Sequence, residues 1–200
     1  MAGKFKDCII VAADSRTSAG ALVTNRVTDK LTHVIDKIYC CRSGSAADTQ
    51  AIANIVKYEL QAKIDGGNFD HSISHNEPAT VKVAAKIFQR YLYQYKDSLT
   101  AGIIVAGWDH RDGFSVYNLP LGGSLHEESL TIGGSGSAFI YGYCDEMYDP
   151  NMDRESALKF MRTALRLAVS RDASSGGILR TAVIDEHGVQ REDILGNEYN

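Results

Sequence analysis

The sequence predicts an α+β fold in which antiparallel sheets are covered by separate helices. Strand-like runs come first, followed by two helical patterns, more strands, two further helical patterns and a last strand pair. This order lacks the regular strand–helix alternation of a parallel sheet. A short polar loop at 109–113 between two apolar runs is typical of an antiparallel hairpin. The length of 200 residues indicates one domain, spanning residues 1–200.

Strands are predicted in the first 45 residues. Residues 8–13 are apolar and rich in β-branched side chains, which indicates a buried strand that stops at Asp14. The polar stretch 14–20 predicts a turn, and residues 21–23 predict a second short strand. Another strand is expected within 35–42, where the adjacent Cys40 and Cys41 would point to opposite faces of a sheet.

The periodicity then changes from that of strands to that of helices. Apolar side chains recur at helical spacing over about 46–63 and again from Val81 to Tyr91, which predicts two amphipathic helices. The glycine-containing stretch 65–68 should end the first helix, and the polar chain up to Pro78 is expected to be a loop.

The second half repeats this order of strands and helices. Residues 102–108 and 114–117 are predicted to form the hairpin, with strand-like residues continuing to Ile132. The glycine-rich stretch 133–137 leads into a helix expected over 138–147.

The last helix and strand pair have clear sequence signals. Asp153 is a suitable N-cap for a helix that ends at 171–177. Residues 178–184 and 188–189 are predicted to form the final strand pair. The apolar face of that helix consists of Ala157, Leu158, Met161, Ala164, Leu165 and Ala168.

Composition excludes several classes of protein. The net charge of −4 argues against a nucleic-acid-binding domain, which would usually be basic. No apolar run approaches the roughly 18 residues that a membrane span needs. The first residues contain no apolar signal-peptide core, so secretion is not expected. The four cysteines form no C-x-x-C pair, so neither a metal site nor another cofactor is expected.

The loop at 133–137 raises the question of phosphate binding, because it lies between a strand and a helix. A P-loop would end in Gly-Lys-Ser/Thr, whereas Gly136 is followed by Ser137 and Ala138. The dinucleotide pattern would need a glycine where Phe139 stands. A tight turn capped by Ser135 or Ser137 explains the loop better than a nucleotide site.

Several charged residues are candidates for chemistry, although each has an ordinary explanation when taken alone. Asp14 could be a turn aspartate that bonds its own backbone. Lys30 could be a surface lysine, and Arg42 a cation at a strand end. Asp172 and Ser175 could belong to a turn after a helix. No G-x-S-x-G elbow supports a serine hydrolase.

Taken together and in order, five motifs resemble those of the proteasome β-subunit family. They are 11–16 (VAADSR), 28–30 (TDK), 42–48 (RSGSAAD), 134–137 (GSGS) and 171–177 (RDASSGG). Four further stretches resemble the eukaryotic β1 type of this family, namely 25–32, 40–50, 101–108 and 140–143. The resemblance covers nearly the whole chain, and five spaced motifs are far more specific than any single one.

The resemblance implies a four-layer α-β-β-α sandwich of two antiparallel sheets, the Ntn-hydrolase fold. It also implies a threonine protease of the 20S proteasome, cytoplasmic and nuclear, in a seven-membered β ring beside an α ring, acting on polypeptide substrates. In the family the mature chain begins with a threonine, whose hydroxyl is the nucleophile and whose α-amine is the base. The alternative hypothesis is a non-catalytic ring subunit of the same fold.

Roles for individual residues follow from the same resemblance. Lys30 matches the lysine that activates the threonine hydroxyl, and Asp14 matches the aspartate that orients this lysine. The backbone N–H of Gly44 matches the oxyanion-hole donor. The residues that match the hydrogen-bonding group around the terminal amine are Ser135, Asp172 and Ser175.

Substrate contacts are implied in the same way. Ser18 and Ala46 match positions whose backbone pairs with the substrate as an added strand. Arg42 matches the floor of the S1 pocket, and Thr28 would line the same pocket. A guanidinium binds a carboxylate in bidentate fashion, so the resemblance implies cleavage after Glu or Asp.

Two features depart from the family pattern. Met1 matches a position a few residues inside the mature start, so the threonine is expected ahead of the sequence given. The stretch 64–74 looks like an insertion between the two central helices, and its polar composition suits a surface loop without a catalytic role.

Overall fold

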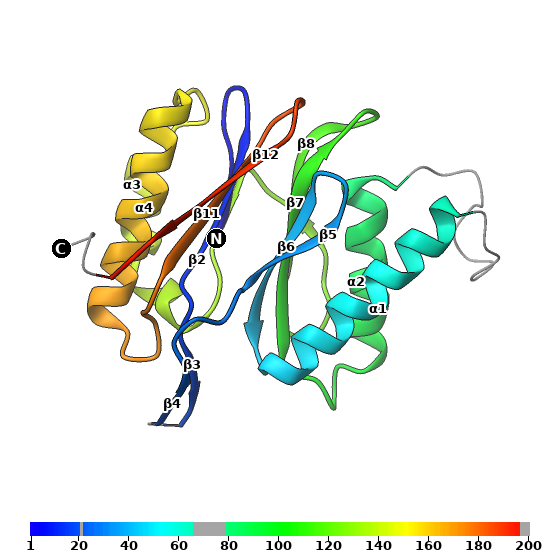
Figure 1. Ribbon diagram of the computed structural model, residues 1–200, viewed down its shortest axis with the longest axis horizontal. Coiled ribbons are helices and arrows are strands. Elements are labelled where there is room, and N and C mark those ends of the chain that lie inside the picture. The colour runs from blue at the N-terminus through cyan, green and yellow to red at the C-terminus, as the bar shows by residue number, and fades with distance from the viewer. Residues whose placement is uncertain (21, 66–78, 197–200) are drawn as a thin grey trace.

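The protein is a sandwich of four layers, with two sheets inside and helices on both outer faces (Figure 1). The computed structural model describes residues 1–20, 22–65 and 79–196. Helices α3 (Tyr141–Met147) and α4 (Arg154–Arg171) cover one sheet. Helices α1 (Ala46–Ile64) and α2 (Val81–Gln94) cover the other. The α+β fold and the four-layer sandwich are therefore confirmed.

The sheet beneath α3 and α4 has the strand order β10-β1-β2-β11-β12. Its members are β10 (Leu130–Thr131), β1 (Ala2–Lys4), β2 (Ile9–Ala13), β11 (Leu179–Ile184) and β12 (Val189–Ile194). All neighbours are antiparallel. Strand β2 is buried along its whole length, because other strands flank it and layers cover both of its faces. It ends at Ala13, so Asp14 follows directly from a fixed, buried strand.

The second sheet has the order β5-β6-β7-β8-β9 and is also antiparallel. Its members are β5 (Leu31–Ile35), β6 (Ile38–Gly44), β7 (Ala101–Asp109), β8 (Gly113–Leu119) and β9 (His126–Glu127). A separate hairpin of β3 (Thr17–Ala19) and β4 (Leu22–Asn25) projects from the body of the protein (Figure 1). Both β2 and β6 end at the same side of the molecule, which brings their following residues together.

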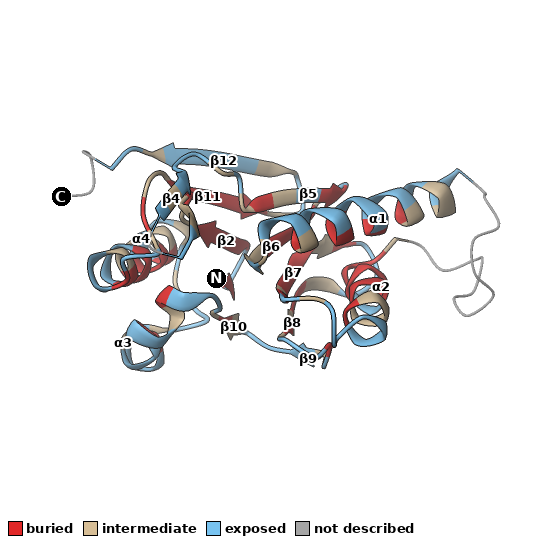
Figure 2. Cartoon of the chain, turned by 90° about the horizontal axis from the view of Figure 1, so that it is seen from below, coloured by how far each residue is buried: buried red, intermediate tan, exposed pale blue. Residues whose placement is uncertain are grey.

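The buried side chains form three apolar cores that alternate with the four layers, as the burial colours show (Figure 2). One core lies between α1, α2 and their sheet, and it contains Cys40. The second lies between α3, α4 and the other sheet, and it contains Cys8 and Cys144. The third lies between the two sheets and contains Cys41. The prediction that adjacent Cys40 and Cys41 point to opposite faces is therefore confirmed.

The helices begin where the sequence provides caps. The Ser45 side chain accepts a hydrogen bond from the Asp48 N–H at the start of α1, and Thr80 accepts one from Val83 at the start of α2. The prediction that Asp153 caps the last helix is confirmed, because its carboxylate accepts a hydrogen bond from the N–H of Ser156.

Three sequence predictions of secondary structure need correction. The expected turn 14–20 contains β3, a short strand that pairs only with β4 and therefore shows no apolar face. Strand β5 went unpredicted up to Ile35, because an irregular register near His33 interrupts its alternation. The expected helix 138–147 is a 3-10 turn over Ser135–Phe139 followed by α3, and no side chain caps either one.

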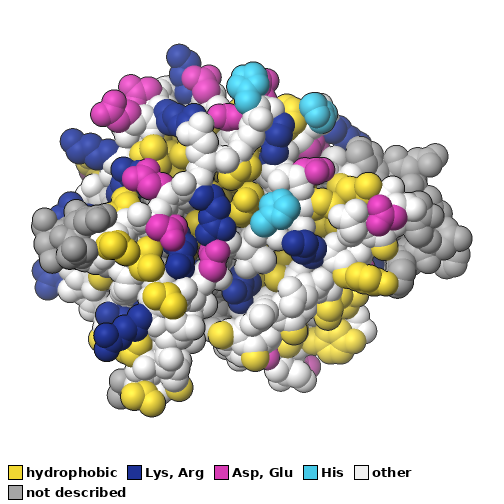
Figure 3. Space-filling view, in the orientation of Figure 1, with side chains coloured by type: hydrophobic (Ala, Val, Ile, Leu, Met, Phe, Trp, Pro, Cys, Tyr) yellow, Lys and Arg dark blue, Asp and Glu magenta, His cyan; other side chains and the backbone are white. Residues whose placement is uncertain are grey.

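The inferred insertion 64–74 falls mostly outside the described residues; Ile64 is the last residue of α1 and Asp65 is its C-cap. Acidic and basic side chains are interspersed on the face that Figure 3 shows. No helix in the described part of the chain is both long and apolar enough to cross a membrane. Within those same residues, no three His, Cys, Asp or Glu side chains are grouped so that they could hold a metal ion.

Candidate active site

A cavity of about 510 Å³ opens where β2 and β6 end. Residues from both sheets, the β3–β4 hairpin and the 3-10 turn line it. All but one of the ten residues that the sequence predicted line this cavity: Asp14, Ser18, Thr28, Lys30, Arg42, Gly44, Ala46, Ser135 and Ser175. Asp172 does not line it, but it contacts two residues that do. The fold thus gathers segments that lie far apart in the sequence.

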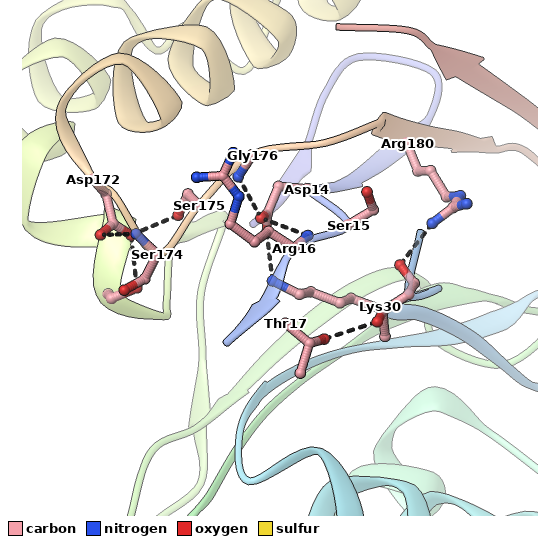
Figure 4. Close-up of polar contacts among 12 residues, drawn as sticks. Asp14, Ser15, Arg16, Thr17, Lys30, Asp172, Ser174, Ser175, Gly176 and Arg180 are labelled. Atoms are coloured by element: carbon pink, nitrogen blue, oxygen red, sulfur yellow. Dashed lines mark hydrogen bonds and ion pairs between the residues drawn. The ribbon is translucent and has the colours of Figure 1, made fainter. Parts of the chain in front are cut away.

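Asp14 and Lys30 form an ion pair at the cavity, with Lys30 Nζ 2.7 Å from Asp14 Oδ1 (Figure 4). The second carboxylate oxygen of Asp14 accepts hydrogen bonds from the backbone N–H groups of Arg16 at 3.1 Å and Gly176 at 2.9 Å. The Asp14 side chain is only 13% exposed and that of Lys30 23%. These three donors compensate the carboxylate for its loss of water, so the pair is held in a fixed geometry.

Asp172 is the centre of a second polar cluster. It is the C-cap of α4, and its Oδ2 accepts hydrogen bonds from the hydroxyls of Ser135 at 2.7 Å and Ser175 at 2.6 Å. Its Oδ1 accepts one from the N–H of Ser174 at 3.0 Å. Burial acts to raise the pKa of Asp172, but these hydrogen bonds outweigh it and hold the pKa below its usual value. The cluster therefore keeps Asp172 ionised.

Glycine at position 136 makes room for this cluster. A Cβ there would lie 2.8 Å from Ser175 Oγ and 3.2 Å from the Ala168 side chain. The loop therefore approaches α4 closely enough for Ser135 to reach Asp172. The prediction that Ser135 or Ser137 caps this turn is wrong, because the turn has no side-chain cap and the Ser135 hydroxyl donates to Asp172 instead.

Arg42 extends from β6, and three neutral groups hold its guanidinium. Nε donates to Thr32 Oγ1 at 2.8 Å, Nη1 to Thr49 Oγ1 at 3.1 Å and Nη2 to the carbonyl of Asp29 at 2.9 Å. No ion pair among the described residues involves Arg42. The side chain also lines a smaller adjoining hollow of about 410 Å³ together with Thr28. Its positive charge is thus fixed at the wall of the cavity without a carboxylate partner from the described chain.

Gly44, Ser18 and Ala46 occupy positions along the edges of the cavity. Gly44 ends β6 with φ +102°, and a Cβ there would lie 2.3 Å from the carbonyl oxygen of Thr100, so this backbone position requires glycine. Ala46 is the first residue of α1, and Ser18 lies in β3. Backbone from a helix start and a strand therefore borders the cavity on two sides.

The structure adds residues to the site that sequence reasoning did not assign. Ser15 is fully buried; its hydroxyl donates to the carbonyl of Arg26 and accepts from the N–H of Ile178 at 2.7 Å. Arg16 lines the cavity and donates to the carbonyl of Ala173 at 2.7 Å. Both belong to the motif that contains Asp14, but their partners are distant in sequence, so no local pattern indicates these contacts.

Met1 also lies at the cavity. Its backbone nitrogen donates to the carbonyl of Ala12 at 2.8 Å, and the N–H of Ala12 donates back to the carbonyl of Met1 at 2.9 Å. The thiol of Cys41 donates to the Met1 carbonyl at 3.7 Å. The start of the described chain is thus paired with β2 and points at the site.

Comparison with known proteins identifies the family. A family model described as "Proteasome subunit" matches residues 1–184. The chain is 50% identical over 199 residues to "Proteasome subunit beta type-1" of Saccharomyces cerevisiae, covering 100% of this chain and 88% of the yeast protein. It is 49% identical over 189 residues to "Probable proteasome subunit beta type-1" of Schizosaccharomyces pombe, covering 94% and 80%. The identity to "Proteasome subunit beta type-6" of Dictyostelium discoideum is 48% over 197 residues, covering 98% and 88%.

The chain belongs to the proteasome subunit family. The two-sheet sandwich described above is the fold that this membership implies. Within the family it is a β1-type subunit of the 20S proteasome, a particle that degrades proteins. It therefore assembles with other proteasome subunits.

Proposed function

We propose that this subunit is a threonine endopeptidase that cleaves unfolded polypeptides after acidic residues. The observation that carries the acidic preference is the environment of Arg42. Its guanidinium is fixed at the cavity wall by neutral oxygen atoms, so its charge is available to a carboxylate from outside the chain. A bidentate guanidinium–carboxylate contact would favour Glu or Asp at P1 over neutral side chains.

The nucleophile in this proposal is the threonine that the family resemblance implies ahead of Met1. Support comes from the placement of Met1 at the cavity that Lys30, Ser135 and Gly44 also line. The threonine hydroxyl attacks the scissile carbonyl carbon, and its proton passes to the threonine α-amine. The ammonium group of Lys30, oriented by Asp14, stabilises the developing alkoxide.

The remaining groups complete the cycle. The N–H of Gly44 donates to the oxyanion of the tetrahedral intermediate, and the charged amine then returns its proton to the leaving amide nitrogen. This step breaks the peptide bond and leaves an acyl ester on the threonine oxygen. Water hydrolyses the ester and regenerates the hydroxyl. Ser135 and Ser175, bonded to Asp172, would orient the α-amine throughout.

Substrate binding in this proposal uses the two borders of the cavity. The backbone at Ser18 and Ala46 would pair with an extended substrate strand, which places alternate side chains toward pockets. The P1 side chain would then enter beside Thr28 and Arg42. The partners proposed are the other β subunits of a seven-membered ring and the adjacent α ring, in the cytoplasm and nucleus.

The test uses native 20S particles that contain this subunit. A peptide electrophile with Glu at P1 should label it, and peptide mass mapping should place the label on an N-terminal threonine. The same particles should cleave a Glu-P1 reporter faster than its Gln-P1 counterpart. A native subunit that carries no terminal threonine and takes up no label would instead be a non-catalytic member of the ring.

A further inference from the structure

The edge strand β12 uses its two faces for different purposes. The side chains of Gln190 and Glu192 point one way and contact α4, where Glu192 pairs with Arg162 at 2.5 Å. Arg191 and Asp193 point the other way, because side chains alternate along a strand. These two residues stay exposed and face the segment 27–31 and Arg180: Arg191 contacts Asp29 and Leu31, and Asp193 contacts Arg180.

A buried cation lies on this inner face. Arg180 is in register with Asp193, on the same face of β11 as the fully buried Ala182 and Ile184. It is only 9% exposed, at a position where the next two inward residues along β11 are apolar. A guanidinium buried there is costly unless its donors are satisfied. The identity of its acceptors therefore shows what the charge holds in place.

The acceptors of Arg180 belong to the segment that carries two proposed site residues (Figure 4). Nη1 donates to the carbonyl of Thr28 at 2.6 Å, and Nη2 to that of Val27 at 3.3 Å. Nε donates to Asp193 Oδ2 at 3.1 Å. Thr28 lines the cavity, and Lys30 follows two residues later.

Arg191 makes a second connection from β12. Its Nη2 pairs with Asp29 Oδ2 at 2.8 Å, and the carbonyl of Asp29 accepts the hydrogen bond from Arg42 Nη2. The Arg42 N–H also donates to the Lys30 carbonyl at 3.1 Å. The same short segment thus links β12 to both the acid-binding guanidinium and the Lys30 ammonium.

We propose that Arg180, supported by Asp193, is a positioning residue that fixes segment 27–30 so that Thr28 and Lys30 face the cavity. This inference rests on the proposed threonine-protease function. Arg180 reaches no cavity-lining side chain itself and acts only through the backbone that it holds. Its loss should therefore change KM for acidic substrates, through Thr28 and Arg42, and kcat, through Lys30.

The test compares particles in which every copy of this subunit carries the substitution. Cleavage rates are divided by the concentration of assembled particles. Arg180→Met should lower kcat/KM for a Glu-P1 reporter about tenfold or more, because small displacements of reacting groups are expensive. It should also reduce the ratio of Glu-P1 to Gln-P1 cleavage. Arg180→Lys, which keeps the charge and reaches fewer acceptors, should recover part of the loss. Asp193→Asn should lower kcat/KM about threefold, as a weakened charged hydrogen bond would.

Arg162→Met is the matched control, since it removes an arginine pair on the opposite face of β12 and leaves segment 27–31 untouched. A purely structural role for Arg180 would reduce only the amount of assembled particle; unchanged kinetics per particle and an unchanged Glu/Gln ratio would overturn the inference. If Arg180→Met does not assemble, wild-type kinetics in both Arg180→Lys and Asp193→Asn would overturn it. Wild-type particles that show no Glu-P1 cleavage by this subunit would refute the proposed function itself.

Discussion

The Asp14–Lys30 pair and Arg42 carry charges at the same cavity, but they are stabilised in opposite ways. Asp14 accepts three hydrogen bonds from within the chain, and one of the three donors is its counter-ion Lys30. Arg42 likewise has three partners, but all are neutral oxygen atoms. Asp14 and Lys30, proposed to act on the nucleophile, thus compensate each other's charge inside the protein, whereas Arg42, proposed to bind substrate, keeps its charge for a ligand.

This difference separates catalytic support from specificity. Altering the internally paired groups should reduce turnover for every substrate, because the damage reaches the reacting atoms. Altering Arg42 should act mainly on substrates that carry a carboxylate, because its charge has no internal counter-ion and its neutral anchors orient it toward the cavity. The following predictions use that distinction.

The largest effect is expected when the internal ion pair is broken. Lys30→Met removes the counter-ion of Asp14 and the positive charge beside the proposed nucleophile, so kcat should fall about 10³-fold for both Glu-P1 and neutral-P1 peptides. Lys57→Met, an exposed lysine of α1, is the control and should retain full activity. Steady-state kinetics on purified particles decide the matter, and near-normal turnover in the Lys30 variant would contradict the assignment.

A selective effect is expected at Arg42. Arg42→Met should lower kcat/KM for a Glu-P1 reporter about 10²-fold, because the P1 carboxylate loses a charged, bidentate partner. A Leu-P1 reporter should change much less. Measuring both reporters on one preparation provides an internal reference, and a parallel loss for the two would show that Arg42 supports the site rather than specificity.

A smaller effect, on stability, is expected at Asp172. Its pKa is lowered in the folded state, so its contribution to the free energy of unfolding is present above its ordinary pKa, near about 4, and is lost as the pH falls through the lowered value. Urea unfolding midpoints between neutral and acidic pH should therefore decline more steeply in wild type than in Asp172→Asn. Converted to free energy of unfolding, the difference should amount to about 1.5–3 kcal/mol, the range for a hydrogen bond to a charged group. Equal slopes would count against an ionised, bonded Asp172.

The smallest effect is expected from a neutral anchor of Arg42. Thr32→Val keeps the shape of the side chain and removes the acceptor of Arg42 Nε. The Glu-P1 to Gln-P1 ratio should fall about threefold, corresponding to one modest hydrogen bond. The ratio is read from paired reporter assays, and no change would indicate that the two remaining acceptors suffice to orient the guanidinium.

Much of the fold could be predicted because local pattern and tertiary environment agree. Helix α1 buries one face, so its buried residues recur at helical spacing. Strands β7 and β8 are largely buried, so they appear in the sequence as apolar runs on either side of a polar turn. Strand β3 pairs only with β4 outside the sandwich, so no buried face marks it in the sequence. Strand β1 contains glycine and owes its place to β2 and β10, which lie elsewhere in the chain.

The site residues also fall into two groups: those that lie in local motifs and those held by contacts that are distant in sequence. The residues in the spaced motifs could be named in advance, and the structure brings them together at one cavity. Ser15 and Arg180 could not be assigned, because they bond to residues far away in the sequence. The partners of Ser15 are 11 and 163 residues away, and the backbone acceptors of Arg180 are 152 and 153 residues away. A single sequence contains no local pattern for such contacts. These supporting residues become visible only when the strands are in place.

The distribution of cysteines has a practical consequence for following how the sandwich opens. All four are free and buried, and each of the three apolar cores contains at least one. Burial raises the pKa of Cys40 to about 12, which leaves only about 10⁻⁵ of that thiol as the reactive thiolate at neutral pH. Alkylation of Cys40 therefore requires the α1–α2 core to open. Burial also raises the pKa of Cys8 and Cys144, which report in the same way on the α3–α4 core, whereas Cys41 lines the cavity and reports on the site itself. The chain thus contains a native set of reporters for the order in which its layers separate.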